Sequence, residues 1–196
     1  MRVMGNLVDF KDCQGWANHA SPPDGVKCPP DLTYQPSPPS PIEMLFIGWN
    51  PPGTTQFWNS STDKLRTNLK WILSQEPFCW KQQDFLNEFL SRGCYLVHAA
   101  RCWADSAWPP VEVAQTCARA LLSKDIQILR PRRICIFGKI PLYAAREVIA
   151  GLPHPEEFAY QKGSCVEVGE MRVIVTVLPH HYDRKYTLEA LRRWWT

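Results

Sequence analysis

Four short apolar runs, separated by segments with helical spacing, constrain the fold of this chain more than any other feature. The runs cover residues 44–49, 94–100, 133–138 and 172–178, and each is almost continuously hydrophobic. Strands that are apolar on both faces are typical of a parallel sheet covered by helices on both sides. The last run can also pair with a short strand at 165–168. The pattern therefore predicts an α/β fold with a central sheet of four parallel strands.

The segments between these runs carry helix signals. Ser61 or Thr62 can cap a helix whose apolar side chains recur with a spacing of i, i+4, i+7 and i+8, starting at Leu65. Four further helices are expected near residues 82–91, from Pro109 to Leu129, from Pro141 to Ile149 and after Thr187.

A stretch rich in proline and serine, residues 21–41, precedes the first strand. Proline fixes φ and lacks an N–H donor, so this composition excludes regular structure and predicts an extended segment. We expect residues 1–42 to form an N-terminal arm that packs on a single α/β domain, residues 43–196. With 196 residues and 45% apolar content, the chain is large enough to bury the core of one such domain.

Composition narrows the class of function. The net charge of +3 permits nucleic acid as a partner without requiring it. The sequence shows neither the apolar segment of a secretion signal nor a run long enough to span a bilayer, so we expect a soluble protein that is not secreted and has no membrane partner. The eight cysteines are then expected to be reduced thiols, metal or cluster ligands, or core residues, rather than a disulfide framework.

Unusual polar chemistry gathers where the predicted strands end. In parallel sheets, ligands bind beyond the carboxyl ends of the strands. The four ends read GWNPPG, HAARCW, FGKIP and LPHHYDRK. We expect them to share one rim that carries Asn50, His98, Arg101, Lys139, His180, His181, Arg184 and Lys185.

Asn50 lies between Trp49 and the sequence Pro51-Pro52-Gly53. One interpretation is a turn asparagine that hydrogen-bonds its own backbone before a proline. The other is that a rigid turn aims the amide at a water or a substrate. An amide can orient a water but cannot deprotonate it. Asn50 therefore suits a reaction whose leaving group departs early.

The pair His180–His181 also admits two interpretations. Either histidine alone fits a hydrogen-bonded surface or half-buried residue. Adjacent strand positions point to opposite sides, so one of the two can face the core and the other a ligand. Beside Arg184 and Lys185, a neutral imidazole N–H could stabilise charge that grows on a leaving group. A metal site is a weaker interpretation, because Asp183 is the only nearby carboxylate and the spacing of zinc ligands is absent.

Aromatic and cysteine side chains accompany the strand ends. Most of the nearby aromatics are expected in the core, and one or two could stack on a planar base; they are Trp49, Phe57, Trp58, Trp103 and Trp108. Four cysteines fall in loops or helices. Core packing is the simpler interpretation of these cysteines, and ligation of a cluster would need all four thiolates to converge; they are Cys13, Cys28, Cys102 and Cys117.

In their order along the chain, these motifs resemble the uracil-DNA glycosylase superfamily. LFIGWNPPG is similar to its first motif, a strand that ends in Gly-x-Asn-Pro-Gly. The blocks YLVHAARC, PPVEVAQTCARALL and LRPRRICIFGKIPLYAA resemble the middle of the iron–sulfur families 4 and 5. VLPHHYDRK stands where a His-Pro-Ser motif is expected. The resemblance covers residues 43–196 and implies a three-layer α/β/α sandwich with a central four-stranded parallel sheet.

The resemblance implies a monofunctional DNA glycosylase that hydrolyses the N-glycosidic bond of uracil or another deaminated base in DNA. It implies a monomer inside the cell, in the cytoplasm with the nucleoid if the source is bacterial. By similarity, Asn50 positions the water that attacks C1′ of a flipped nucleotide, and His180 stabilises negative charge on the departing base. The implied base-binding residues are Gly48, Trp49, Phe57, His98 and His181, with Phe57, or else Trp58, as the stacking ring. The implied DNA contacts are Arg101, Lys139, Arg184 and Lys185.

Departures from the family pattern leave alternatives open. Trp49 stands where family 4 has an acidic residue. His180-His181-Tyr182 replaces His-Pro-Ser, so His181 could be the working residue instead. His98 takes the place of an asparagine of family 4, whose amide can contact two groups of a pyrimidine at once. A neutral imidazole makes only one of these contacts well, so relaxed base selectivity is expected unless His98 packs away from the base.

The cysteine pattern departs as well. Families 4 and 5 begin with Cys-x-x-Cys, whereas Cys13 is followed by Gln14, Gly15 and Trp16. Cys28 could replace the missing ligand of a [4Fe–4S] cluster, together with Cys13, Cys102 and Cys117, or the cluster is absent. The alternative function is a catalytically inactive relative that binds DNA. A metal-dependent α/β hydrolase is a third hypothesis, for which the sequence has neither a Gly-x-Ser-x-Gly elbow nor a carboxylate-rich ligand set.

Overall fold

The computed structural model describes residues 26–27, 36–50, 57–101, 103–104, 111–159, 162–180 and 182–195. They contain a five-stranded sheet with the order β3-β2-β5-β7-β6. Its strands are β2 (Met44–Gly48), β3 (Cys94–His98), β5 (Arg133–Phe137), β6 (Ser164–Val168) and β7 (Met171–Thr176). The four predicted parallel strands, β2, β3, β5 and β7, are confirmed. β6 pairs antiparallel with β7, so the sheet has five strands rather than four.

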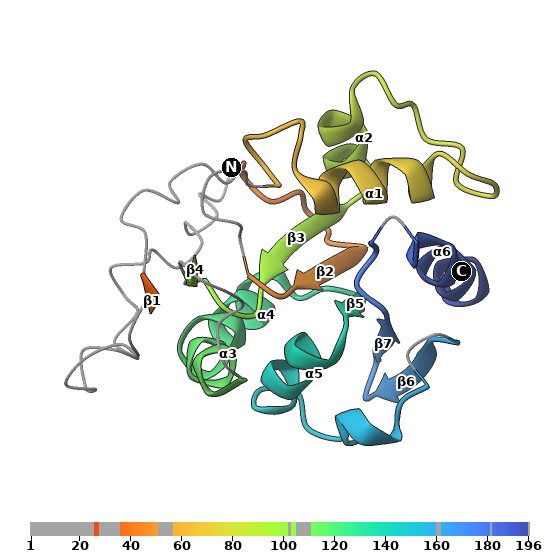
Figure 1. The fold of residues 1–196 in the computed structure, drawn as a ribbon. Coiled ribbons are helices and arrows are strands. Elements are labelled where there is room, and N and C mark those ends of the chain that lie inside the picture. The colour runs from red at the N-terminus through yellow and green to blue at the C-terminus, as the bar shows by residue number, and fades with distance from the viewer. Residues whose placement is uncertain are drawn as a thin grey trace.

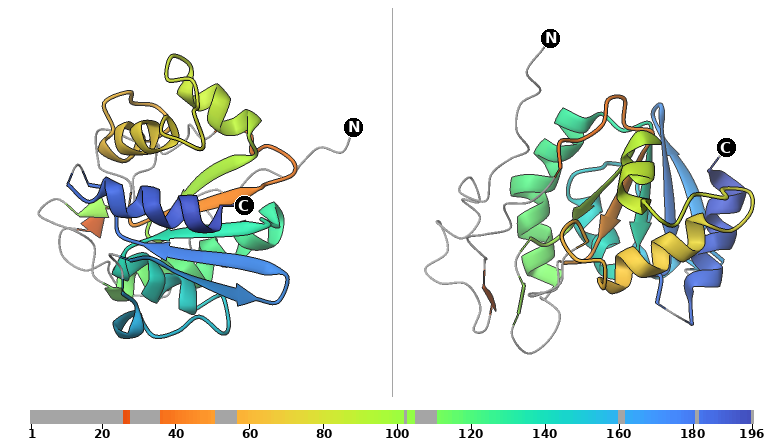
Figure 2. Two further views of the ribbon diagram at one scale, coloured as in Figure 1. Left: turned by 90° about the vertical axis from the view of Figure 1, so that its right-hand side faces the viewer. Right: turned by 90° about the horizontal axis from the view of Figure 1, so that it is seen from above.

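Helices cover both faces of this sheet. One face carries α1 (Lys64–Leu73), α2 (Phe85–Ser91) and α6 (Arg184–Trp194); the other carries α3 (Val111–Cys117), α4 (Ser123–Leu129) and α5 (Lys139–Arg146) (Figures 1 and 2). The contacts of α2 with β3, of α6 with β7 and of α5 with β5 agree with this arrangement. The predicted three-layer α/β/α sandwich is therefore confirmed.

Two helices differ in detail from the sequence expectation. The segment expected as one helix from Pro109 to Leu129 is seen as α3 and α4, joined by a π-helical stretch, η2 (Ala118–Leu122). The last helix begins at Arg184, before Thr187 rather than after it. Thr187 is fully buried, and its hydroxyl donates to the carbonyl of Val177 at 3.1 Å, so the first turn of α6 is tied to the chain that leaves β7.

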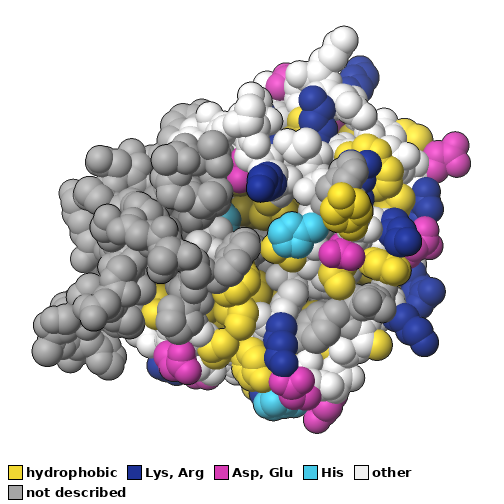
Figure 3. Space-filling view, in the orientation of Figure 1, with side chains coloured by type: hydrophobic (Ala, Val, Ile, Leu, Met, Phe, Trp, Pro, Cys, Tyr) yellow, Lys and Arg dark blue, Asp and Glu magenta, His cyan; other side chains and the backbone are white. Residues whose placement is uncertain are grey.

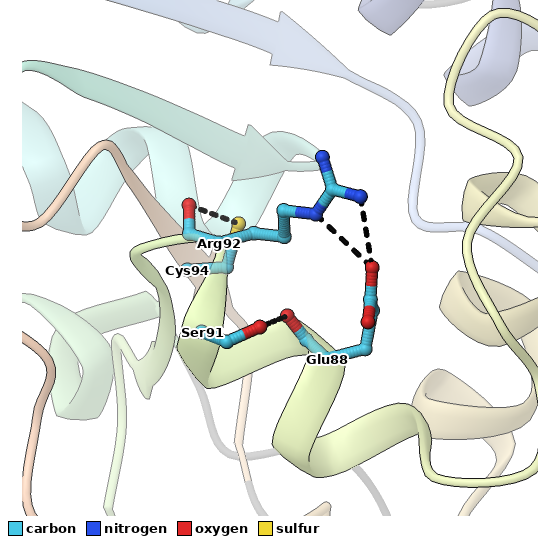
Figure 4. A network of polar contacts seen from close by, with 4 residues as sticks. All are labelled: Glu88, Ser91, Arg92 and Cys94. Carbon is cyan, nitrogen blue, oxygen red and sulfur yellow. Dashed lines mark hydrogen bonds and ion pairs between the residues drawn. The ribbon is translucent and has the colours of Figure 1, made fainter.

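The turn between α2 and β3 sets the start of β3 beside the start of β2. Gly93 has φ of +72°, and a Cβ there would lie 2.9 Å from Cγ of Glu43, so the position requires glycine. Nε of Arg92 donates to Glu88 at 3.0 Å, and the Ser91 hydroxyl donates to the Glu88 carbonyl at 2.9 Å (Figure 4). These contacts close α2 immediately before the strand.

The register of β2 and β3 positions the pocket described below. Met44 pairs with Cys94, and four residues on Gly48 pairs with His98. Every residue of both strands is buried, as a strand covered on both faces requires. The two strands therefore end side by side, with a glycine opposite a histidine.

Part of the predicted N-terminal arm is described. β1 (Val26–Lys27) pairs antiparallel with β4 (Trp103–Ala104). The hydroxyl of Tyr95, in β3, donates to the carbonyl of Pro36 at 2.9 Å. Most of residues 1–42 lie outside the described residues, so the arm as a unit stays a prediction. In the described part of the chain, no helix is long and apolar enough to cross a membrane.

Candidate active site

A pocket of about 470 Å³ lies at the carboxyl ends of the parallel strands. Three strand ends contribute side chains to it, and helix α1 forms a further wall. The strand ends supply Trp49, Asn50, His98, Leu178, Pro179 and His180, and the α1 region supplies Thr62, Asp63, Lys64, Leu65 and Asn68. The sequence prediction that Asn50, His98 and His180 share one rim is thus met by the structure.

Asn50 follows the last hydrogen-bonded residues of β2. The amide N–H of Ala99 donates to the Gly48 carbonyl at 2.9 Å, and that of Ala100 donates to the Trp49 carbonyl at 2.8 Å. The pairing with β3 therefore continues to the residue just before Asn50 and holds it at the pocket. Asn50 is partly buried. The proline turn after it, residues 51–56, lies outside the described residues.

His98 forms the floor of the pocket beside Gly48. A Cβ on residue 48 would lie 3.2 Å from Cδ2 of His98 and 3.3 Å from Cδ2 of Leu65, which is tighter than ordinary packing. Glycine at position 48 therefore lets the imidazole lie directly against the strand. His98 is 8% exposed. Burial, with a smaller contribution from the charge of Arg101, lowers the pKa of His98 from 6.5 to about 3, so the imidazole is neutral at physiological pH.

His180 stands at the mouth of the pocket with an exposed side chain. Its backbone is held on both sides. The His180 N–H donates to the Leu178 carbonyl at 2.7 Å, and its own carbonyl accepts from Arg184 N–H at 2.8 Å. The exit from β7 and the start of α6 thus fix this residue over the pocket. His181, the other member of the predicted pair, lies outside the described residues.

Helix α1 supplies pocket residues that the sequence analysis missed. Asp63 is 2% exposed, and its Oδ1 accepts from the N–H of Arg66 at 2.7 Å. Asp63 is therefore the cap of α1, and the expectation of Ser61 or Thr62 in that role is wrong. Burial raises the pKa of the Asp63 carboxyl, opposed by the backbone donors of the cap.

Asn68, the second missed residue, is 8% exposed. It interrupts the apolar face that Leu65, Leu69 and Ile72 form on α1. A polar side chain inside such a stripe is the signal that could have revealed it.

Phe57 does not line the pocket, contrary to the expectation of a ring that stacks on a base. It is 1% exposed, with its ring centroid 4.9 Å from that of Trp58 and 5.5 Å from that of Phe89. The aromatic face of α2 offers this ring more apolar contact than the rim does. Trp58, the alternative stacking ring, is 4% exposed and packs on Tyr95.

Arg101 is not placed to contact DNA phosphate. It is 3% exposed and forms an ion pair with Asp125, which is fully buried on α4. Burial raises the pKa of the Asp125 carboxyl, and the neighbouring guanidinium opposes that rise. A buried charge needs a partner, and the nearest one lies beneath the strand end rather than in solvent. Arg101 therefore joins β3 to α4.

The other three predicted DNA contacts lie on the surface. Lys139 forms an ion pair with Glu156, and its side chain is 45% exposed. The guanidinium carbon of Arg184 lies 3.9 Å from the ring centroid of Trp71, so α6 is tied to α1. Lys185 is exposed, with Nζ 5.0 Å from the ring centroid of Tyr186. Figure 3 shows histidine side chains near the middle of the face viewed, with Lys and Arg side chains around them.

The predicted cluster ligands are only partly described. Cys117 is 1% exposed on α3, whereas Cys13, Cys28 and Cys102 lie outside the described residues. Within the described ranges, no three metal-ligating side chains lie together. Three of the four predicted ligands lie outside those ranges, so the ligand set stays a prediction.

A second pocket, of about 400 Å³, lies at the amino-terminal edge of the sheet. It is lined by aromatic side chains and three arginines. Arg92 pairs with Glu88 at 3.0 Å (Figure 4), and Arg192 pairs with Glu189 at 2.9 Å, so carboxylates already offset much of this charge. Open α/β sheets bind their ligands at the opposite, carboxyl edge. The pocket of Asn50, His98 and His180 is therefore the candidate active site.

Comparison with known families identifies the superfamily of the chain. The family model described as Uracil DNA glycosylase superfamily matches residues 37–195 of the chain. The match begins before β2 and ends in the last residues after α6, so it spans every strand and helix that forms the pocket. No curated protein sequence matches the chain.

Proposed function

The chain belongs to the uracil DNA glycosylase superfamily, and from this premise we propose that it is a monofunctional DNA glycosylase that hydrolyses the N-glycosidic bond of uracil and other deaminated bases. One observation carries the proposal. Asn50, His98 and His180 lie far apart in the sequence and line one pocket at the carboxyl edge of the sheet. Its volume of about 470 Å³ suits a small ligand such as a flipped nucleotide.

The proposed reaction begins when the target nucleotide leaves the base stack and enters the pocket. The bond between C1′ and the base nitrogen breaks early, and its electron pair leaves with the base. Asn50 orients a water whose oxygen bonds to C1′, and the proton released balances the charge of the departing base. The products are a free base and an abasic site. A weakly activated water suffices, because the leaving group has largely departed before attack.

His180 is proposed to stabilise the base as it leaves. Its side chain is exposed at the mouth of the pocket, so an imidazole N–H can reach a carbonyl oxygen of the base. Donors aimed at developing charge contribute more in a site shielded from water than in bulk solvent. His181 stays an alternative for this role.

Two lysines are proposed to bind the DNA backbone. Lys64 lines the pocket mouth with an exposed side chain, and Lys185 is exposed at the start of α6, five residues after His180. Lys64 lines the pocket that a flipped nucleotide would enter, and Lys185 follows the pocket residue His180 closely in the chain. Each lysine that contacts a phosphate adds about one unit to the salt dependence of binding.

Base selectivity is proposed to be relaxed. His98 is neutral and lies against Gly48, where one donor or acceptor nitrogen can meet the base. Uracil and at least one other deaminated base, such as hypoxanthine or xanthine, should be excised with rates within roughly tenfold to a few hundredfold, the scale of one or two contacts. His98→Asn should narrow the range toward uracil.

A structural [4Fe–4S] cluster held by Cys13, Cys28, Cys102 and Cys117 is a further part of the proposal, and it rests on the sequence resemblance. Cys117 is buried on α3, on the same face of the sheet as α4, which carries Asp125. Such a cluster would pin the proline-rich arm to the sheet and would supply no redox chemistry to the reaction.

The direct test is strand scission by alkali after incubation with a uracil-containing oligonucleotide. We expect abasic sites with the wild-type protein, with or without chelator, and a loss of several orders of magnitude for Asn50→Ala, whose DNA binding should persist. Binding without excision by the wild type would identify the inactive DNA-binding relative instead. Activity that disappears with chelator would favour the metal-dependent hydrolase.

A further inference from the structure

Asn68 is a buried polar side chain that lines the candidate active site. It is 8% exposed and lies on the inner face of α1. Within the described residues, its side-chain amide takes part in no hydrogen bond. The neighbouring positions of the same face, Leu65, Leu69 and Ile72, are apolar and pack in or against the core. Packing alone would therefore be served by leucine at position 68.

Most of the Asn68 side chain is buried, but its amide atoms stay open to the pocket, since they are not among the buried polar atoms that lack a partner. A polar group placed in this way can meet a molecule that enters the pocket. On ligand binding, the amide would exchange water for fixed hydrogen-bond partners.

The position of α1 places Asn68 in the same part of the pocket as His98. Leu65 precedes Asn68 by one helical turn on the same face. Cδ2 of Leu65 and Cδ2 of His98 approach the position of a Cβ on Gly48 at 3.3 and 3.2 Å. The helix and the end of β3 therefore meet over Gly48, and His98 and Asn68 line the same pocket, so a ligand held there can contact both the imidazole and the amide.

We propose that Asn68 is a specificity-determining residue whose amide reads the N–H and C=O groups that lie side by side on a deaminated base. This inference rests on the proposed function. Deamination converts an amino group into a carbonyl and its neighbouring ring nitrogen into an N–H. An amide accepts from that N–H and donates to that carbonyl at the same time. Uracil, hypoxanthine and xanthine share this edge, whereas cytosine and adenine present an acceptor nitrogen beside an amino group.

This assignment changes the explanation of substrate choice. His98 alone offers one contact, and so it predicts little selection between a deaminated base and its parent. An amide in the same pocket as His98 would select the N–H and C=O edge that uracil, hypoxanthine and xanthine share without selecting one ring size. It would reject cytosine and adenine, whereas thymine and guanine carry the same pair of groups and would have to be rejected by other side chains.

Binding of free bases tests the inference without any need for catalysis. NMR titrations would measure the affinities of uracil, 3-methyluracil and cytosine for the wild type, Asn68→Leu and Thr67→Val. Thr67 is exposed on the same helix, so Thr67→Val is a matched polar-to-apolar control. We expect uracil to bind wild type and control equally, and to bind Asn68→Leu roughly 10- to 100-fold more weakly. 3-Methyluracil, which lacks the N–H, should bind all three proteins weakly.

Excision rates on uracil oligonucleotides provide the second measurement. If the wild type excises uracil and Asn68→Leu does so equally well, with unchanged discrimination against cytosine, the inference fails while the proposed function stands. If the wild type binds uracil through Asn68 but excises nothing, the proposed function fails while the reading role stands. Equal binding of uracil and cytosine by the wild type would show that the Asn68 amide can rotate to pair with either base. That result would refute the proposed role of Asn68 in specificity. Asn68→Leu should unfold at a urea concentration no lower than the wild type, which excludes misfolding as the cause.

Discussion

Acidification should destabilise this protein through His98. Its imidazole lies against Gly48 and is 8% exposed. The pKa of His98 is lowered from 6.5 to about 3, mainly by burial and to a lesser extent by the charge of Arg101. The folded state therefore holds the neutral form, whereas the unfolded chain takes up a proton as the pH falls below 6.5.

The sign and size follow from proton linkage. Because the pKa of His98 is lower in the folded state, its contribution to stability is fully present above pH 6.5 and is lost progressively as the pH falls toward 3. Between about pH 7.5 and about pH 5.5, the free energy of unfolding should fall by about 1.4 kcal/mol from this group alone. That loss is large against a typical total stability of about 5–15 kcal/mol.

Urea unfolding followed by tryptophan fluorescence at both pH values would measure the effect. His98→Asn should lose less stability than the wild type on acidification, by about 1.4 kcal/mol. His180→Asn, a change at an exposed histidine, should show the wild-type dependence. Burial raises the pKa values of Asp63 and Asp125, so these carboxyls increase the free energy of unfolding on acidification, opposite to His98. Both carboxyls are present in all three proteins, so their effect cancels in the comparison. An equal loss in wild type and His98→Asn would refute the argument that His98 is buried and neutral.

Three further changes test other parts of the structure. His180→Ala should lower excision by roughly 10²-fold and His181→Ala by less; the reverse order in single-turnover assays would move the role to His181. Arg101→Met should lower the free energy of unfolding, measured with urea, by about 3–5 kcal/mol, because it leaves the Asp125 charge buried and unpaired. The double variant Arg101→Met, Asp125→Leu should recover much of this free energy. A small loss in the single variant would contradict the buried ion pair. If the predicted [4Fe–4S] cluster is present, the purified protein should contain four iron atoms per chain, and Cys117→Ser should lower the iron content. A wild-type protein with free thiols and no iron would rule the cluster out.

Local sequence patterns were sufficient to predict the layers and to predict that Asn50, His98 and His180 line one pocket. Apolar runs of six or seven residues, separated by segments with helical spacing, predicted the parallel strands, because burial on both faces demands such runs. Parallel strands end at one edge of a sheet, so Asn50, His98 and His180 could be brought together without any knowledge of their contacts. The expected pairing of 165–168 with the last parallel strand was likewise correct.

Only the tertiary structure decided which partners individual side chains contact. Arg101 lies three residues after His98, the last residue of β3, yet it pairs with Asp125, 24 residues later in the chain. Phe57 joins the aromatic side chains of α2 instead of the pocket. Asn68, for which the sequence analysis made no prediction, lines the pocket from α1. Periodicity reports whether a position is buried, but not which distant element buries it. That choice depends on the packing of elements far apart in the sequence. It decides whether an arginine such as Arg101 forms a buried ion pair or stays exposed, and whether a side chain joins the core or lines the pocket.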